Sequence, residues 1–170
     1  TALRTGLRRG ELMALRWEDV DLKASKLFVR RNVWRGQITT PKNGRMREVP
    51  LSPEAVRVLR GHRHMRSELV FCNEDGSMVG RKQMRNIVPR VCRRAGLRRV
   101  QWHVLRHSFA SQLVLAGVPL KAVQELLGHR DIKMTMRYAH MAPSALSDAV
   151  SKLDDAANSG HYMGTTQQLK

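Results

Sequence analysis

Apolar and polar positions in the first third of the chain change from a helical spacing to an alternating one. A short helix is predicted at residues 10–15, followed by a polar turn at 17–21. Segments with strand character follow at residues 26–33, 37–40 and 46–51. Asn43-Gly44, between the last two segments, is a residue pair that two-residue hairpin turns favour. We therefore expect a three-stranded antiparallel sheet.

The rest of the chain predicts helices that begin or end at proline and glycine. Ser52-Pro53 is a helix start, with a capping hydroxyl before a proline, and this helix should run to about Met65. After a short strand at 69–72, further helices are expected at residues 81–95, 103–116, 119–127, 131–140 and 143–157. Pro89 should kink or split the first of these.

These elements predict an α+β fold that is predominantly helical, with one small antiparallel sheet. A chain of 170 residues with 42% hydrophobic composition suits a single globular domain. We place that domain at residues 1–157 and a polar tail at 158–170. Because the chain opens at Thr1 with a motif already under way, we expect a fragment of a longer protein.

The charge of the chain points to a polyanionic partner. Lys and Arg number 31 against 14 Asp and Glu, which gives a formal net charge of +17. Residues 81–99 contain no acidic side chain and eight basic ones, namely Arg81, Lys82, Arg85, Arg90, Arg93, Arg94, Arg98 and Arg99. A solvated basic surface would explain a milder imbalance, but this excess favours binding to nucleic acid.

The two cysteines and the absence of long apolar runs narrow the class of protein. Cys72 and Cys92 lack the spacing of a disulfide framework or a zinc module. The sequence contains no signal peptide and no apolar run long enough to cross a membrane. We expect a soluble, intracellular protein.

Arg8 and Glu11 occur at a predicted turn into a helix, one helical turn apart. A carboxylate at that spacing can hold a guanidinium in one orientation. The motif taken alone is equally compatible with a surface ion pair at a helix start.

His103, Arg106 and His107 share one side of a predicted helix whose other side carries an apolar stripe. They offer imidazole groups and a guanidinium, whose donors match phosphate oxygens. Two histidines four residues apart also occur at zinc sites. Zinc is disfavoured here, because the Glu of a metalloprotease helix is missing and Arg106 would repel a cation.

Three further residues gain meaning only from their neighbours in the sequence. His129 follows a predicted helix stop at Gly128 and, alone, is typical of a polar loop residue. Tyr138 alone is typical of an amphipathic core position, and Lys42 is typical of a turn lysine.

Taken in order, these motifs resemble those of the tyrosine recombinase and phage integrase family. They are Thr-Gly-Leu-Arg-x-x-Glu-Leu, a basic hairpin, His-x-Leu-Arg-His, Leu-Gly-His and Tyr-Ala-His, between about Thr5 and Met141. The resemblance implies the catalytic-domain fold of DNA breaking-rejoining enzymes. It also implies a catalytic set of Arg8, Lys42, His103, Arg106, His129 and Tyr138, with Glu11 and His107 in support.

The roles that this resemblance implies suit phosphodiester exchange. Arg8 and Arg106 would clamp the phosphate, and His129 would donate a further hydrogen bond. His103 would assist proton transfer at the nucleophile Tyr138, and Lys42 would protonate the departing 5′-oxygen. A 3′-phosphotyrosyl link keeps the bond energy for rejoining, so we expect no metal and no other cofactor.

The resemblance further implies double-stranded DNA as the partner and a homotetramer in the synaptic complex. We expect a bacterial or phage-encoded protein, located in the cytoplasm with the nucleoid, and a chain that lacks the family's N-terminal DNA-clamping domain. Three alternatives remain open at this stage. They are a helix-turn-helix-like DNA-binding module around Gly117, a type IB topoisomerase, and a degenerate remnant.

Overall fold

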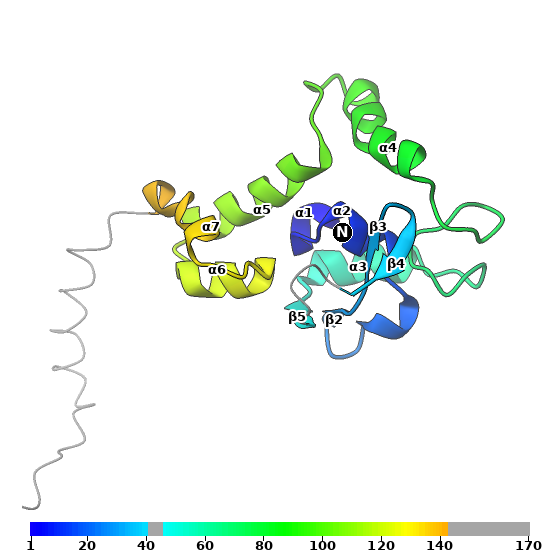
Figure 1. Ribbon diagram of the computed structural model, residues 1–170, viewed down its shortest axis with the longest axis horizontal. Coiled ribbons are helices and arrows are strands. Elements are labelled where there is room, and N and C mark those ends of the chain that lie inside the picture. The colour runs from blue at the N-terminus through cyan, green and yellow to red at the C-terminus, as the bar shows by residue number, and fades with distance from the viewer. Residues whose placement is uncertain (41–45, 143–170) are drawn as a thin grey trace, which may run out of the picture.

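The structure, a computed structural model, describes residues 1–40 and 46–142. Figure 1 shows a mainly helical molecule with two small β units. The first half contains α1 (Ala2–Thr5), α2 (Arg9–Met13), a 3₁₀ turn (Trp17–Asp19), β1 (Val20–Asp21), β2 (Lys26–Val29), β3 (Asn32–Trp34), β4 (Gln37–Thr39), β5 (Arg47–Pro50) and α3 (Pro53–Gly61). The second half contains α4 (Arg81–Arg94), α5 (Trp102–Leu115), α6 (Leu120–Leu127), α7 (Lys133–Met136) and a 3₁₀ turn (Ala139–Met141).

The main sheet has the predicted number of strands, but its membership differs from the prediction. Its three antiparallel strands have the order β1-β2-β5, with Leu27 opposite both Val20 and Val49. β1 was expected to be part of a turn. The predicted strand at 26–33 divides into β2 and β3, and β3 pairs with β4 in a separate two-stranded ribbon.

A buried carboxylate accounts for the division between β2 and β3. Asp19 is only 1% exposed, and it binds Arg30 Nη1 at 3.2 Å and Arg31 Nη1 at 2.8 Å. Because a buried charge must be paired, these contacts hold the chain in a bend between the two strands. The ribbon then reverses at Arg35-Gly36, where both residues have positive φ (50° and 87°), as hairpin turns of the primed types require. The hairpin expected at Asn43-Gly44 lies outside the described residues.

The helices agree with the prediction most closely where a cap or a glycine marks the boundary. α3 starts after Ser52, whose Oγ accepts a hydrogen bond from the Ala55 backbone N–H, although it ends at Gly61, before Met65. Pro89 was expected to kink or split the helix around it, and α4 continues through Pro89 without a split. The helix predicted at 131–140 is shorter, because α7 ends at Met136 and a 3₁₀ turn follows Tyr138.

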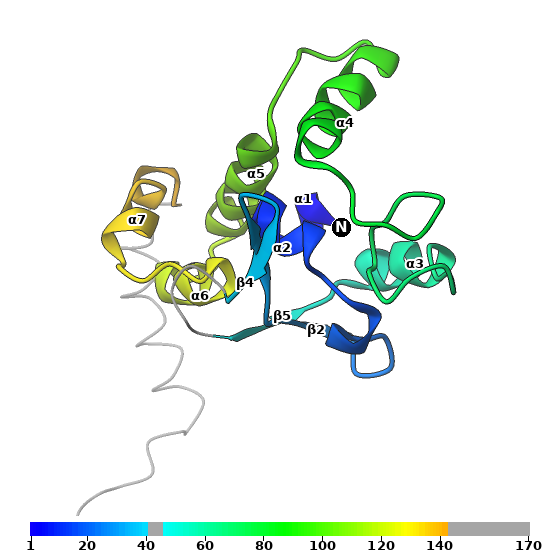
Figure 2. The ribbon, with the colours of Figure 1, turned by 45° about the vertical axis from the view of Figure 1, so that its right-hand side comes forward.

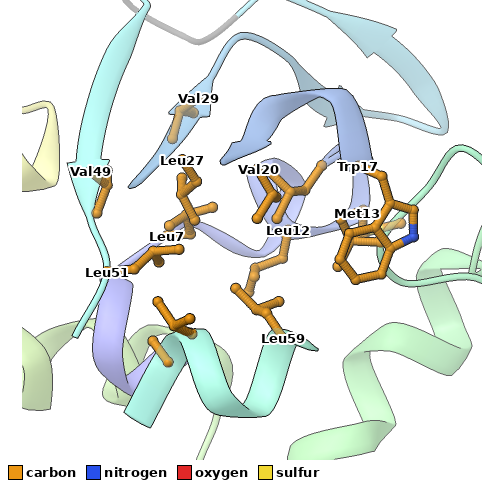
Figure 3. Close-up of a cluster of buried hydrophobic side chains, with 14 of the residues drawn as sticks. Leu7, Leu12, Met13, Trp17, Val20, Leu27, Val29, Val49, Leu51 and Leu59 are labelled. Carbon is orange, nitrogen blue, oxygen red and sulfur yellow. The ribbon is translucent and has the colours of Figure 1, made fainter. Parts of the chain in front are cut away.

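Two clusters of buried apolar side chains organise the molecule. The larger one lies between the main sheet and helices α2 and α3, where Leu27 and Val49 face Leu12 and Leu59 (Figure 3). The smaller one joins α5 and α6 to Tyr138. Figure 2 shows α5, α6 and α7 on one side of the molecule and the sheet with α3 on the other. α1 packs against α5 and so connects the two sides.

Gly10 tests the contact between α2 and the β3–β4 ribbon. A Cβ atom at Gly10 would lie 2.3 Å from Asn32 Oδ1 and 2.6 Å from the Val33 carbonyl oxygen. We expect Gly10→Ala to lower the free energy of unfolding by about 1–3 kcal/mol, because the methyl group would push the ribbon off the helix. Urea denaturation measures this change. Gly61→Ala is the control, since a Cβ there meets nothing within 4 Å; equal stability of the two variants would contradict the predicted contact.

Candidate active site

Three arginines from distant parts of the sequence converge on the last carbonyl groups of α6. The carbonyl oxygens of Leu126, Leu127 and Gly128 accept hydrogen bonds at 3.0, 2.5 and 3.3 Å. The donors are, in the same order, Arg47 Nε, Arg106 Nη2 and Arg8 Nη2. The final carbonyl groups of a helix lack partners within the helix and carry its partial negative charge, so cations stabilise them.

Glu11 makes this concentration of positive charge possible. Its carboxylate is 1% exposed and binds Arg47 through two hydrogen bonds of 2.7 and 3.0 Å, and Arg8 Nη1 at 2.9 Å. The Arg8 backbone N–H donates to the same carboxylate at 2.8 Å. Burial alone would raise the pKa of Glu11, but the bonds and charge of Arg47, followed by those of Arg8, lower the pKa to about 2. Glu11 therefore holds both guanidinium groups in fixed orientations.

Arg106 is fixed between the two sides of the molecule. Its Nη1 donates to the Gly6 carbonyl oxygen at 2.5 Å, and its Nη2 donates to that of Leu127 at 2.5 Å. Burial and then the charge of Arg8 lower the pKa of Arg106 to about 9, despite the opposite effect of Glu11. The guanidinium remains predominantly charged at neutral pH.

Arg8, His103 and Arg106 line one cleft of about 970 Å³. Its walls come from the start of α2, the β3–β4 ribbon and the start of α5. The structure thus brings three of the predicted residues to one opening. Among the described residues, its lining does not include His107, His129 or Tyr138.

His129 directly follows Gly128, whose φ of 62° ends α6 in the left-handed conformation. Its Nδ1 lies 2.9 Å from Oγ1 of the buried Thr135. Burial and then the charges of Arg106 and Arg8 lower the pKa of His129 to about 4. The ring is therefore neutral at pH 7.

Tyr138 is paired with His107 rather than with His103. The Tyr138 hydroxyl lies 2.5 Å from His107 Nδ1, and the tyrosine, 6% exposed, packs in the smaller apolar cluster. Burial raises the pKa of Tyr138. The pKa of His107 is lowered, first by burial and then by the charge of Arg137. His103 is exposed, with its ring centroid 5.9 Å from that of His107. Proton transfer at Tyr138 was expected to involve His103, whereas the observed contact is to His107.

Sequence reasoning did not identify Arg47 and Thr135. Arg47 occurs in a short strand, where no spacing distinguishes it from a surface arginine. Thr135 lies three residues before Tyr138, and only its burial reveals that its hydroxyl faces His129. Lys42, from the expected set, lies outside the described residues.

Residues 1–40 and 46–142 contain neither a cluster of metal-binding side chains nor a membrane-spanning helix. These residues contain no group of three or more His, Cys, Asp or Glu side chains that could hold a metal ion. In the same ranges, no helix is long and apolar enough to cross a membrane.

Comparison with known proteins gives consistent matches. Residues 1–145 match the model of the phage integrase family. A XerC-like tyrosine recombinase of Caldanaerobacter subterraneus subsp. tengcongensis is 31% identical over 91% of this chain and 47% of its own length. The integrase of Salmonella phage P22 is 31% identical over 90% of this chain and 41% of its own length. The chain spans about half the length of the curated relatives that it matches.

Solved structures agree with these matches. The XerA recombinase has a TM-score of 0.69 and 26% identity, over 89% of this chain and 55% of that protein. The catalytic domain of bacteriophage HP1 integrase has a TM-score of 0.64 and 27% identity, over 92% of this chain and 80% of that one. The XerH site-specific recombinase bound to its difH substrate has a TM-score of 0.66 and 28% identity, over 90% of this chain and 44% of that one.

Glu11→Gln tests the buried ion pairs. The substitution keeps the size of the side chain but leaves Arg47 with an uncompensated buried charge. We expect the free energy of unfolding at pH 7 to fall by about 3–5 kcal/mol, as measured by urea denaturation. Glu54→Gln is the matched control, because Glu54 also binds an arginine three residues away in the sequence but does so at the surface. Similar losses in the two variants would contradict a special role for Glu11.

Acid should remove the contribution that ionised Glu11 makes to the free energy of unfolding. Because the pKa of Glu11 falls from 4.5 to about 2 on folding, the stabilisation is complete above pH 4.5 and is lost as the pH falls toward 2. The difference in stability between the unsubstituted protein and Glu11→Gln should therefore narrow across that window. A constant difference would contradict the assigned ionisation.

Proposed function

This chain belongs to the phage integrase family, and from that premise we propose that it cuts and rejoins double-stranded DNA at specific sites through a covalent bond to Tyr138. The observation that carries the proposal is the convergence of Arg8, Arg106 and His129 at the end of α6, with the Tyr138–His107 pair nearby. The relatives named above are recombinases and integrases, and neither the helix-turn-helix alternative nor the topoisomerase alternative gains support from them.

Arg8 and Arg106 would bind the nonbridging oxygens of the scissile phosphate. A guanidinium carries five N–H donors, and the bonds described for Arg106 occupy Nη1 and Nη2 once each. Donors therefore remain for an anion in the cleft. Because the carbonyl groups of α6 already hold the guanidinium groups, little reorganisation is needed when charge develops on the phosphate.

The chemical step would be a transfer that conserves phosphodiester bonds. The Tyr138 oxygen attacks phosphorus, the bond to the 5′-oxygen breaks, and that oxygen leaves with a proton from Lys42. His107 Nδ1, already in contact with the Tyr138 hydroxyl, would accept the phenolic proton. Its lowered pKa favours the neutral form, which can accept that proton. Attack by a 5′-hydroxyl reverses the sequence, so the energy of the bond is retained.

The DNA duplex would extend beyond the cleft onto the basic surface of residues 81–99. The side chains of Met84, Val88 and Cys92 form the buried stripe of α4, and all of its arginines are exposed. Contacts of this kind neutralise backbone phosphates without reading the bases.

Recombination between two duplexes breaks four strands, and each copy of the chain contributes one Tyr138. We therefore propose a homotetramer in the synaptic complex. Since the relatives named above are bacterial and phage proteins, we also propose that it acts on DNA in a bacterial cytoplasm, at the nucleoid.

Tyr138→Phe tests the nucleophile. We expect this variant to form no covalent complex with a nicked suicide DNA substrate, because the only atom removed is the attacking oxygen, while its affinity for DNA stays nearly unchanged. Denaturing electrophoresis detects the complex, and a filter-binding assay measures the affinity. Tyr162→Phe, which alters the only other tyrosine, is the control and should retain the complex. A covalent adduct in the Tyr138→Phe variant would overturn the assignment.

Lys42→Ala tests the general acid. A general acid contributes roughly 10²- to 10⁴-fold, so cleavage of ordinary DNA should slow by about that factor. A substrate with sulfur in the 5′-bridging position should be cleaved at nearly the unsubstituted rate, because a thiolate leaves without protonation. The sulfur-containing substrate should not rescue Arg106→Ala, because Arg106 would act on the nonbridging oxygens. If Lys42→Ala slows both substrates equally, Lys42 is only a phosphate contact.

A further inference from the structure

The buried hydroxyl group of Thr135 contacts Nδ1 of the His129 ring, on the side away from Nε2. Thr135 Oγ1 lies 2.9 Å from His129 Nδ1, and Thr135 has no exposed surface. Within residues 1–40 and 46–142, this is the only hydrogen bond of the Thr135 hydroxyl and the only side-chain hydrogen bond of His129. The His129 backbone is fixed separately, because its carbonyl oxygen accepts a hydrogen bond from Gln124 Nε2 at 3.2 Å.

Burial decides which partner donates the proton. A threonine hydroxyl has one proton to donate and can also accept. Since water does not reach Thr135, a hydrogen bond in which it only accepted would leave its proton buried without a partner, which is costly. The hydroxyl therefore donates to Nδ1, and Nδ1 carries no proton. In a neutral imidazole the proton is then on Nε2.

We propose that Thr135 is a positioning residue that fixes His129 in the tautomer with Nε2–H, so that the ring presents a hydrogen-bond donor to the scissile phosphate. This inference rests on the proposed function for the identity of the anion. The tautomer itself follows from the geometry of the unbound protein. In the opposite tautomer, Nε2 would present a lone pair to a phosphate oxygen, and the two would repel each other.

Charge on the histidine does not supply the donor instead. With a pKa of about 4, lowered first by burial and then by Arg106 and Arg8, His129 stays neutral at the pH of the reaction. A neutral ring has one N–H group, so the partner of Nδ1 determines where it points. The tautomer therefore decides whether Nε2 of His129 is a hydrogen-bond donor or an acceptor.

Thr135 also lies between the histidine and the nucleophile. The Tyr138 backbone N–H donates to the Thr135 carbonyl oxygen at 2.9 Å, across the last turn of α7. One residue therefore orients the His129 ring with its side chain and the turn before Tyr138 with its backbone. A loss of the hydroxyl alone should affect His129 and spare the turn.

Nitrogen-15 NMR of the unbound protein at pH 7 tests the tautomer directly. We expect His129 Nδ1 to appear as an unprotonated ring nitrogen and Nε2 as a protonated one, with the signals assigned by their loss in His129→Gln. The Thr135→Ser variant keeps the hydroxyl and should keep this pattern. A protonated Nδ1 in the unsubstituted protein overturns the proposal, whatever the protein does to DNA.

The rate of covalent-complex formation at saturating DNA tests the consequence. Thr135→Val has nearly the same shape but no hydroxyl, and we expect a loss of about 10- to 100-fold in rate, as for other residues that orient a catalytic group. DNA affinity should stay close to that of the unsubstituted protein, and Thr135→Ser should restore most of the rate. Equal losses in the two variants, or no loss in Thr135→Val, overturn the proposal.

The proposed recombination and the positioning role of Thr135 are tested independently by these two measurements. If the unsubstituted protein forms no covalent complex while NMR shows Nε2–H, the proposed function fails and the positioning role of Thr135 stands. If the complex forms and the tautomer is the opposite one, the proposed function stands and the role of Thr135 fails.

Discussion

The buried carboxylate of Glu11 is the interaction on which the rest of the site depends. Arg8, Arg47 and Arg106 would repel one another if they met at the end of α6 without a counter-charge, and Glu11 binds two of them directly. The three guanidinium groups can then bind consecutive carbonyl groups of the helix. Because these contacts join β5, α5 and the start of α2 to α6, the same cluster also holds the two sides of the molecule together.

This arrangement stores positive charge in a preorganised form. Each guanidinium is oriented by acceptors that the protein supplies, so in the proposed reaction a phosphate would meet donors already in place. The field of the cluster also lowers the pKa of His129, in addition to the effect of burial. A neutral histidine next to charged arginines has a different role from theirs, because the position of its single proton depends on a neighbour, Thr135.

The proposed nucleophile, Tyr138, belongs to a different part of the structure from the cleft that Arg8 and Arg106 line. Tyr138 is buried among apolar side chains of α5 and α6, whereas Arg8 and Arg106 open into a cleft between α2, the ribbon and α5. For the proposed reaction, a phosphate held in that cleft must come within reach of the tyrosine. The elements around it are short, since α7 has four residues and a 3₁₀ turn follows. Few backbone hydrogen bonds therefore oppose a rearrangement of this segment.

The sequence by itself determined the fold class, most helix boundaries and the types of residue in the candidate site. Caps, glycines and apolar spacing are local signals, and the ordered motifs from Arg8 to Tyr138 are visible without coordinates. Only the tertiary structure decided the partners. It placed His107 rather than His103 on Tyr138, added Arg47 and Thr135, and divided the predicted strand where Asp19 binds Arg30 and Arg31. The physical reason is that pairing a buried polar or charged group depends on which elements meet in space, and spacing along the chain carries no information about those meetings.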